Sequence, residues 1–208
     1  MEINNCGALL LVGPTGSGKT PLGDICEEKG LGEGRCTHFD FGENLRKIAR
    51  TGEGPASLTE EEKKTISWSL KTGALLENKY FHIARKILLN FARQAQLVEP
   101  DLILLNGLPR HVGQARDIDA IIEIKKVVYL ECSPLVARER IRLNSGGDRE
   151  GRKDDSLEAI QKKLELFHSR TLPLLEHYRN KHVDIEKINV QVETKPLQLH
   201  QWLDASGW

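Results

Sequence analysis

The residues whose types and spacing specify chemistry most clearly are those at 13–20. They read Gly-Pro-Thr-Gly-Ser-Gly-Lys-Thr and match the pattern GxxxxGK(S/T) at every fixed position. In such a loop the glycines let the backbone approach phosphate oxygens, the lysine reaches the β- and γ-phosphates, and the last hydroxyl ligates Mg²⁺. The sequence therefore predicts a nucleoside triphosphate site. Its predicted binding residues are Gly13, Thr15, Gly16, Ser17, Gly18, Lys19 and Thr20.

The elements around this loop are the ones that its chemistry requires. Residues 8–12 are all apolar and predict a short buried strand, and residues 22–29 can continue as a helix. A strand–loop–helix unit directs backbone N–H groups and the positive end of the helix dipole at an anion. The alternative is a glycine-rich turn that binds nothing. It is disfavoured because the motif and the surrounding elements agree.

The rest of the chain alternates between predicted strands and predicted helices. The run 101–106 is apolar between polar ends, as expected of a strand that is covered on both faces. Further strands are predicted at 36–41, 126–132 and 183–190. Helices are predicted at 42–50, 59–71, 77–95 and 113–124, from Ser133-Pro134 onward, from 155 or 156 to about 180 with an interruption near Pro173, and through 197–203. This alternation predicts a parallel α/β sheet with right-handed crossovers.

Two stretches fit poorly into a plain α/β core, namely 41–76 and the polar, glycine-containing stretch 143–152. Both are expected to be insertions at the ends of strands, where α/β proteins bind ligands. Insertions there serve as substrate-binding parts and lids, and Gly146-Gly147 would let the second stretch hinge. We expect a single domain over 1–208 that carries these two insertions.

Composition excludes several classes of protein. Among the 208 residues, 30 Lys and Arg balance 30 Asp and Glu, so no global basic field points to nucleic acid or to an anionic membrane. The longest apolar runs are far shorter than the roughly 20 residues that span a bilayer. The 4 cysteines form no CxxC pair and are typical of reduced thiols. The sequence predicts a cytoplasmic monomer without a nucleic-acid or membrane partner.

Four further stretches resemble motifs of one family. Residues 41–46 (FGENLR) resemble its TGDxLR stretch, and residues 72–78 (TGALLEN) resemble its GxLVPDE turn. Residues 106–110 (NGLPR), followed by Gln114, resemble DGFPR…Q, and residues 152–155 (RKDD) resemble RxDD. With the phosphate loop these motifs run colinearly over nearly the whole chain, which thereby resembles the adenylate kinase (nucleoside monophosphate kinase) family. The resemblance implies a parallel five-stranded sheet flanked by helices, with 41–76 as the monophosphate-binding insertion and 143–152 as a short lid.

The resemblance also implies a reaction and roles for individual residues. The reaction is Mg²⁺-dependent transfer of the γ-phosphoryl group of ATP to a nucleoside monophosphate, with AMP as the expected acceptor. Arg46 and Arg110 would hold the acceptor phosphate, since a guanidinium forks onto phosphate oxygens and stays charged. Gln114 would hydrogen-bond an adenine edge, and Arg140, with Arg149 or Arg152, would close over both nucleotides. The remaining implied assignments are Gly42, Leu76 and Gly107 beside the acceptor, Thr20 and Asn106 at the metal, and Lys19, Arg110, Arg140 and Arg152 as catalytic residues.

Several residues depart from the family's pattern. Phe41 replaces a small residue beside the base, and Asn106 replaces an acid that orders water around Mg²⁺. Asn144 and Lys163 stand where arginines are expected. Lysine keeps the charge of arginine but loses its planar fork.

These departures leave three functions open. The favoured one is a nucleoside monophosphate kinase that acts on AMP. Phe41 keeps open phosphoryl transfer to another small acceptor, and the missing charges keep open a catalytically weak nucleotide-binding regulator. If Asn106 does not serve the metal, Glu43 or Asp40 is the acid expected to hold the metal-bound water instead.

Overall fold

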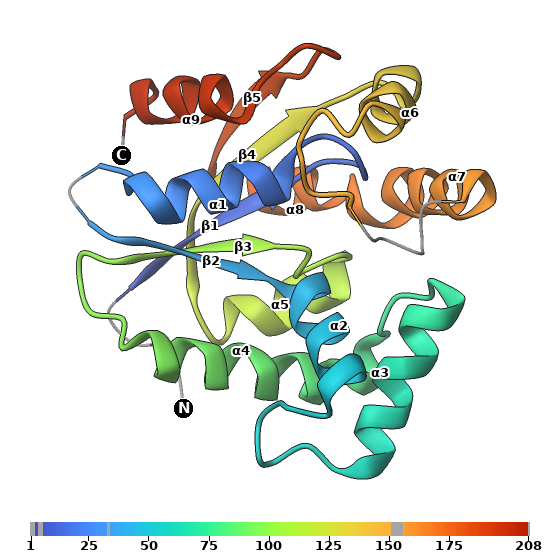
Figure 1. The fold of residues 1–208 in the computed structure, drawn as a ribbon. Helices are drawn as coiled ribbons and strands as arrows, with labels where there is room; N and C mark the ends of the chain where they lie inside the picture. The colour runs from blue at the N-terminus through green and yellow to red at the C-terminus, as the bar shows by residue number, and fades with distance from the viewer. Residues whose placement is uncertain (1–2, 4–5, 33, 151–155, 208) are drawn as a thin grey trace.

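The computed structural model describes residues 3, 6–32, 34–150 and 156–207. Within them, five parallel strands form one sheet in the order β2-β3-β1-β4-β5 (Figure 1). The strands are β1 (Gly7–Val12), β2 (Cys36–Asp40), β3 (Leu102–Asn106), β4 (Glu123–Glu131) and β5 (Asp184–Asn189). The parallel five-stranded sheet expected from the sequence is therefore confirmed.

Helices cover both faces of this sheet (Figure 1). One face carries α1 (Lys19–Lys29) and α9 (Pro196–Ala205). The other carries α4 (Phe81–Ala95), α5 (Val112–Asp119) and α8 (Leu174–Asn180). Beyond the carboxyl ends of β2 and β4 lie α2 (Phe41–Thr51), α3 (Glu60–Thr72), α6 (Pro134–Arg142) and α7 (Leu157–Leu166). These four helices and the phosphate loop therefore share one edge of the sheet.

The central strand β1 is buried on both faces, as its unbroken apolar sequence predicts. Leu9 and Leu11 pack in one core cluster with Leu22 of α1 and Leu199 of α9. Leu10 and the other alternate residues of β1 pack in a second cluster with α4, α5 and α8. Successive side chains of a strand point to opposite faces, so a strand between two helical layers needs apolar residues at every position.

Local sequence signals set the ends of α2 and α3, the two helices that follow β2 and are called the arm below. The Asp40 side chain accepts a hydrogen bond from the Glu43 backbone N–H and begins α2. Thr59 and Glu62 form a reciprocal capping box that begins α3. Gly52 ends α2 in the left-handed conformation that glycine adopts without strain. The predicted start of the second helix at 59 agrees with this cap.

The helix predicted at 113–124 is too long. It ends at Asp119, and β4 begins at Glu123, where it pairs with Gly7 of β1. The isoleucines at 121, 122 and 124 are buried in the turn after α5 and in the start of the strand. Short apolar runs fit either period, and pairing with β1 selects the strand.

The long helix predicted to reach about 180 is interrupted near Pro173, as expected. The interruption is preceded by a π-helical turn, η2 (Phe167–Thr171), which the sequence did not predict. The helix predicted from 77 begins as a short 3₁₀ turn, η1 (Asn78–Tyr80), and becomes α-helical at Phe81. π-Helical turns occur frequently at functional sites, and η2 contacts the site described below.

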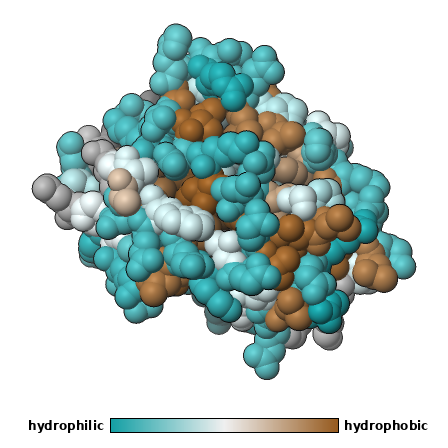
Figure 2. Space-filling view, turned by 90° about the horizontal axis from the view of Figure 1, so that it is seen from above, coloured by the Kyte–Doolittle hydropathy of each residue, from teal (hydrophilic) through white to brown (hydrophobic). Residues whose placement is uncertain are grey.

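The surface is mixed in character. Hydrophilic residues cover most of the face seen from above, with apolar side chains exposed between them (Figure 2). Trp68, Leu135 and Leu157 are among the large apolar side chains that are at least half exposed. In the described part of the chain, no helix combines the length and the apolar character needed to cross a membrane.

Candidate nucleotide and phosphoryl-transfer site

The phosphate loop connects β1 to α1 at the carboxyl edge of the sheet. Gly16 and Gly18 have φ values of 84° and 96°, in the left-handed region that other residues rarely adopt. A side chain on Gly16 would also collide with the Ala137 carbonyl oxygen, since its Cβ would lie 2.6 Å away. The glycines of the motif are therefore required by backbone conformation and by close packing against α6.

Lys19 is folded back onto its own loop. Its Nζ donates hydrogen bonds to the carbonyl oxygens of Gly13 at 2.7 Å and Pro14 at 2.8 Å. Burial, together with the positive charges of Arg149 and Arg110, lowers the pKa of Lys19 to about 7. Arg149 and Arg110 are therefore close enough to Lys19 to repel its charge, and a bound polyanion would relieve this repulsion.

The described part of the predicted lid already contacts this loop. The Arg149 Nη2 donates to Thr15 Oγ1 at 3.2 Å, and the Arg149 backbone N–H donates to Asn144 Oδ1 at 3.1 Å. Asn144 has a φ of 48°, so this residue turns the chain at the end of α6 and fixes the segment that carries Arg149. The other predicted lid arginine, Arg152, lies outside the described residues.

Arg140, predicted to be catalytic, is buried against backbone carbonyl groups in this structure. Its side chain is only 2% exposed, and Nε donates to the Gly16 carbonyl oxygen at 2.9 Å. Nη1 donates to the carbonyl oxygens of Gln191, Val192 and Thr194 at 2.8, 3.1 and 2.8 Å. Arg140 therefore joins α6, the phosphate loop and the segment after β5, which supports a positioning role, and its catalytic role stays a prediction.

The two arginines expected to hold the acceptor phosphate converge over glycine backbone. A Cβ on Gly42 would lie 3.3 Å from Arg46 Nη1 and 3.8 Å from Arg110 Nη2, and one on Gly107 would lie 3.5 Å from Arg110 Nη2. Arg110 Nε donates to the Gly107 carbonyl oxygen at 3.0 Å, and Arg46 Nε pairs with Glu43 Oε2 at 2.9 Å. The sequence prediction that these four residues form one site agrees with this arrangement.

A further contact holds the backbone of Arg110 in place. Thr171 in η2 donates through Oγ1 to the Arg110 carbonyl oxygen at 2.8 Å. The neighbouring Arg170 forms an ion pair with Glu77, just past the arm of α2 and α3, with an Nη2–Oε2 distance of 2.9 Å. Sequence reasoning missed both residues. The only available signal was the irregular stretch before Pro173.

Gln114 and its neighbours are more enclosed than expected for a base-binding pocket. Gln114 is 1% exposed; its Oε1 accepts from the Arg110 backbone N–H and its Nε2 donates to the Leu76 carbonyl oxygen, both at 2.8 Å. Phe41 is 2% exposed and stacks on Phe39, with ring centroids 6.1 Å apart. The Gln114 amide therefore faces backbone groups, and Phe41 belongs to the core.

Thr20 and Asn106, predicted at the metal, do lie together beside the loop. Asn106 Nδ2 is 3.1 Å from Thr20 Oγ1 and 2.9 Å from Asp40 Oδ2, and Thr20 Oγ1 donates to the same Asp40 oxygen at 2.7 Å. Asp40, which the sequence offered only as a substitute acid, is thus in contact with both predicted residues. Burial alone would raise the pKa of Asp40, but hydrogen bonds from Thr20 and the Glu43 N–H, with nearby positive charge, lower it below its ordinary value.

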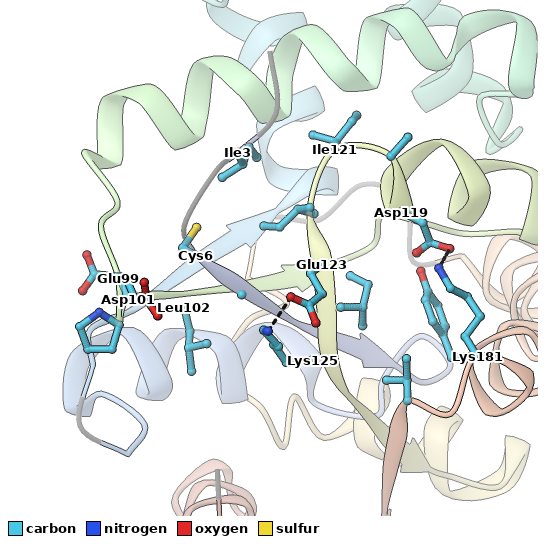
Figure 3. Close-up of a pocket in the computed structure, with 17 residues that line it drawn as sticks. Ile3, Cys6, Glu99, Asp101, Leu102, Asp119, Ile121, Glu123, Lys125 and Lys181 are labelled. Atoms are coloured by element: carbon cyan, nitrogen blue, oxygen red, sulfur yellow. Dashed lines mark hydrogen bonds and ion pairs between the residues drawn. The ribbon is translucent and has the colours of Figure 1, made fainter.

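A separate hollow of about 830 Å³ lies at the opposite edge of the sheet. It is lined by residues at the amino ends of the strands, including Cys6, Leu102 and Glu123, with the ion pairs Lys125–Glu123 and Lys181–Asp119 at its wall (Figure 3). Parallel α/β proteins bind ligands at the carboxyl ends of their strands. The phosphate-loop edge therefore remains the candidate site.

The fold and this site define a P-loop protein built to bind nucleotide phosphates. The sequence family described as an AAA domain matches residues 12–161, more than half of the chain. The chain is 29% identical over 199 residues to an adenylate kinase of Synechococcus sp. (strain CC9311), covering 89% of this chain and 96% of that protein. It is 28% identical over 211 residues to adenylate kinase isoenzyme 1 of Rattus norvegicus, covering 98% and 97%.

A third relative has a different name: UMP-CMP kinase 3 of Oryza sativa subsp. japonica is 25% identical over 185 residues, covering 87% of this chain and 77% of that protein. The phosphate loop, the parallel sheet and these relatives lead to one assignment. The chain belongs to the adenylate kinase (nucleoside monophosphate kinase) family of P-loop proteins.

Proposed function

We propose that this protein is a Mg²⁺-dependent nucleoside monophosphate kinase that transfers the γ-phosphoryl group of ATP to AMP and forms two ADP. The observation that carries the proposal is the presence of two cationic groups side by side at one edge of the sheet. One group surrounds the phosphate loop, and the other lies over Gly42 and Gly107. Phosphoryl transfer requires mainly positioning and stabilisation of negative charge.

The donor half of the site is suited to a triphosphate. Lys19 lies within the loop, and Arg149 reaches the loop through Thr15. This contact supports the proposal that Arg149 is a lid arginine. The same proposal for Arg152 rests on the sequence alone. Charged side chains that converge in this way stabilise phosphate oxygens most effectively where water is excluded.

The acceptor half is suited to a single phosphate group. Arg46 and Arg110 both approach Gly42, and the charge of Arg110 is close enough to Lys19 to lower the pKa of that lysine. A phosphate held by Arg110 would therefore lie near one held by Lys19. This proximity supports direct transfer between two bound nucleotides.

The proposed domain organisation follows from the same contacts. Residues 41–76 would bind the monophosphate, and 143–152 would form the lid of a single domain over 1–208. Lys162 in α7, the helix that follows the lid, donates to the Thr72 carbonyl oxygen at 2.6 Å. This hydrogen bond joins α7 to the end of α3. We include in the proposal that the protein works as a cytoplasmic monomer with nucleotides as its only small-molecule partners.

One observation favours a second candidate function, transfer to a small phosphorylated acceptor without adenine. Phe41 and Gln114 are both buried, and both ends of the Gln114 amide are already bonded to backbone groups. Binding an adenine edge would require Gln114 to exchange one of these bonds for a bond to the base. An acceptor recognised through its phosphate alone would not require this exchange.

The test is a coupled assay that measures ADP formation from ATP with AMP, CMP, UMP, GMP and dTMP. We expect the highest kcat/KM with AMP, and no transfer by the Lys19→Ala variant, which serves as the matched negative control. A higher kcat/KM with a pyrimidine monophosphate would refute AMP as the acceptor and retain the kinase. Absence of transfer to all five acceptors would refute the nucleoside monophosphate kinase and leave two functions, the second candidate and a nucleotide-binding regulator.

A further inference from the structure

Asp40 and Asn106 are neighbours across two strands at the edge of the phosphate-loop site. Each is the last residue of its strand, and the register of β2 and β3 pairs them directly. Adjacent strands are about 4.8 Å apart, so a carboxylate on either residue reaches nearly the same place. The amide of Asn106 contacts the Asp40 carboxylate at 2.9 Å.

The Asp40 carboxylate is held in one orientation by contacts on both oxygens. Oδ1 accepts from the Glu43 backbone N–H at 2.9 Å, which begins α2. Oδ2 accepts from Thr20 Oγ1 at 2.7 Å and from Asn106 Nδ2. The oxygen next to the phosphate-loop hydroxyl is therefore fixed by the fold before any ligand binds.

His38 holds the Asn106 amide in the orientation that donates to this carboxylate. His38 is buried, its Nδ1 lies 2.9 Å from Asp24 Oδ1, and its Nε2 lies 3.3 Å from Asn106 Nδ2. The tautomer with its proton on Nδ1 satisfies both contacts, since Nε2 then accepts from the amide. Asn106 is thus a donor toward Asp40.

Mg²⁺ is a hard cation that takes oxygen ligands and keeps several waters. In P-loop proteins the hydroxyl that ends the motif and a strand-end acid hold this ion beside the donor phosphates. Thr20 and Asp40 supply a hydroxyl and a carboxylate oxygen 2.7 Å apart, so the residues present fit the cation. The amide of Asn106 contributes no negative charge.

We infer that Asp40 supplies the acidic oxygen for the Mg²⁺ that accompanies ATP, and that Asn106 positions Asp40. The family resemblance implies an acid at the end of β3, where this chain has Asn106. Here the acid, Asp40, stands at the end of the neighbouring strand β2, so the site keeps one negative charge. The inference rests on the proposed function for its donor nucleotide, ATP. It does not depend on the identity of the acceptor.

The test compares Asp40→Asn, Asn106→Asp and the double variant that carries both changes. Isothermal titration with a non-hydrolysable ATP analogue, with Mg²⁺ and with EDTA, measures how much the cation strengthens binding. We expect Asp40→Asn to reduce the Mg²⁺-dependent part of the affinity roughly 10–100-fold. In EDTA this variant should bind as well as wild type or better, because a negative charge near the phosphates is removed.

Asn106→Asp alone places a second carboxylate beside Asp40, so its Mg²⁺-dependent binding should be at least as strong as that of the double variant, which keeps only the acid at 106. The double variant returns a single acid to the pair and should recover at least part of the loss. Asp184→Asn is the matched control. Asp184 is an exposed carboxylate at the amino end of β5, far from the phosphate loop, so its loss should leave Mg²⁺-dependent binding unchanged. Asparagine begins helices as well as aspartate does, so Asp40→Asn should fold, which its thermal melt verifies.

The inference is overturned if Asp40→Asn keeps Mg²⁺-dependent binding within twofold of wild type while Asn106→Asp strengthens it about tenfold. It is also overturned if wild type binds the analogue equally well with Mg²⁺ and with EDTA. Failure of AMP as an acceptor, with the expected binding pattern intact, would refute only the proposed acceptor. The two proposals therefore fail in different experiments.

Discussion

Replacing Arg140 by alanine separates the role that the sequence suggests from the role that the structure assigns. The substitution removes a buried guanidinium that donates to four carbonyl oxygens, those of Gly16, Gln191, Val192 and Thr194. A buried acceptor left without a partner costs about 1–3 kcal/mol. The acceptors beyond β5 can regain water in part, so the total should be about 3–5 kcal/mol, less than the sum of four such costs.

This loss should be easy to measure. For a domain of this size, each kcal/mol of unfolding free energy changes Tm by about 2–4 °C, so Arg140→Ala should lower Tm by roughly 10 °C. Arg142→Ala is the matched control from the same helix, because Arg142 is exposed and pairs only with Glu139 in the described contacts. An exposed pair of this kind contributes up to about 1 kcal/mol, so its Tm should fall by a few degrees at most.

Calorimetry of both variants, with and without an ATP analogue, decides the question. We expect Arg140→Ala to weaken binding of the analogue as well, since Arg140 holds the phosphate loop at Gly16. If the two variants melt alike while Arg140→Ala alone loses transfer by a hundredfold or more, Arg140 contacts the substrate. The positioning role would then be wrong.

Three other predictions concern the acceptor, the arm and the lid. Arg46→Ala and Arg110→Ala should each raise KM for the acceptor about tenfold or more and leave ATP affinity unchanged, since a charge-assisted hydrogen bond contributes roughly 1.5–3 kcal/mol; initial-rate kinetics and titration check this. Burial opposes ionisation of Glu62, but its hydrogen bond to Lys86 prevails and lowers its pKa, so Glu62 adds stability above about pH 4.5 that is lost as the pH falls through the lowered value. Thermal melts of Glu62→Gln and wild type should therefore differ at pH 7 and converge as the pH falls below the lowered pKa of Glu62. Hydrogen exchange at 143–150 should slow when a bisubstrate analogue binds, and full protection without ligand would refute a moving lid.

The parts of the molecule that are local in sequence could be predicted, and the contacts between distant residues could not. The phosphate loop, the buried strands and the cap at Thr59 follow from patterns of fewer than ten residues. The family resemblance predicts Arg140 to be catalytic, whereas its partners at Gln191 and Thr194 lie 51 and 54 residues away. No pattern near Arg140 encodes that contact.

The same limit explains why the sequence did not predict the partners of Gln114 and Asp40. Gln114 bonds to Leu76, 38 residues earlier in the chain, and Asp40 meets Asn106, which is 66 residues later. Motif matching examines each position by itself and finds an acid missing at 106. Only the pairing of β2 with β3 shows that an acid is present next to it.

The pairing of Asp40 with Asn106 also constrains how sequences of this fold can change. A single substitution in this pair yields either two adjacent acids, which repel each other when no cation is bound, or two amides and no charge beside Thr20. Two repelling acids destabilise the protein when no cation is bound, and two amides offer a cation no charge, so the two positions are expected to vary together. A sequence comparison that scores each alignment column separately counts such an exchange as two losses. A comparison that scores the two paired positions together would count it as one conserved charge.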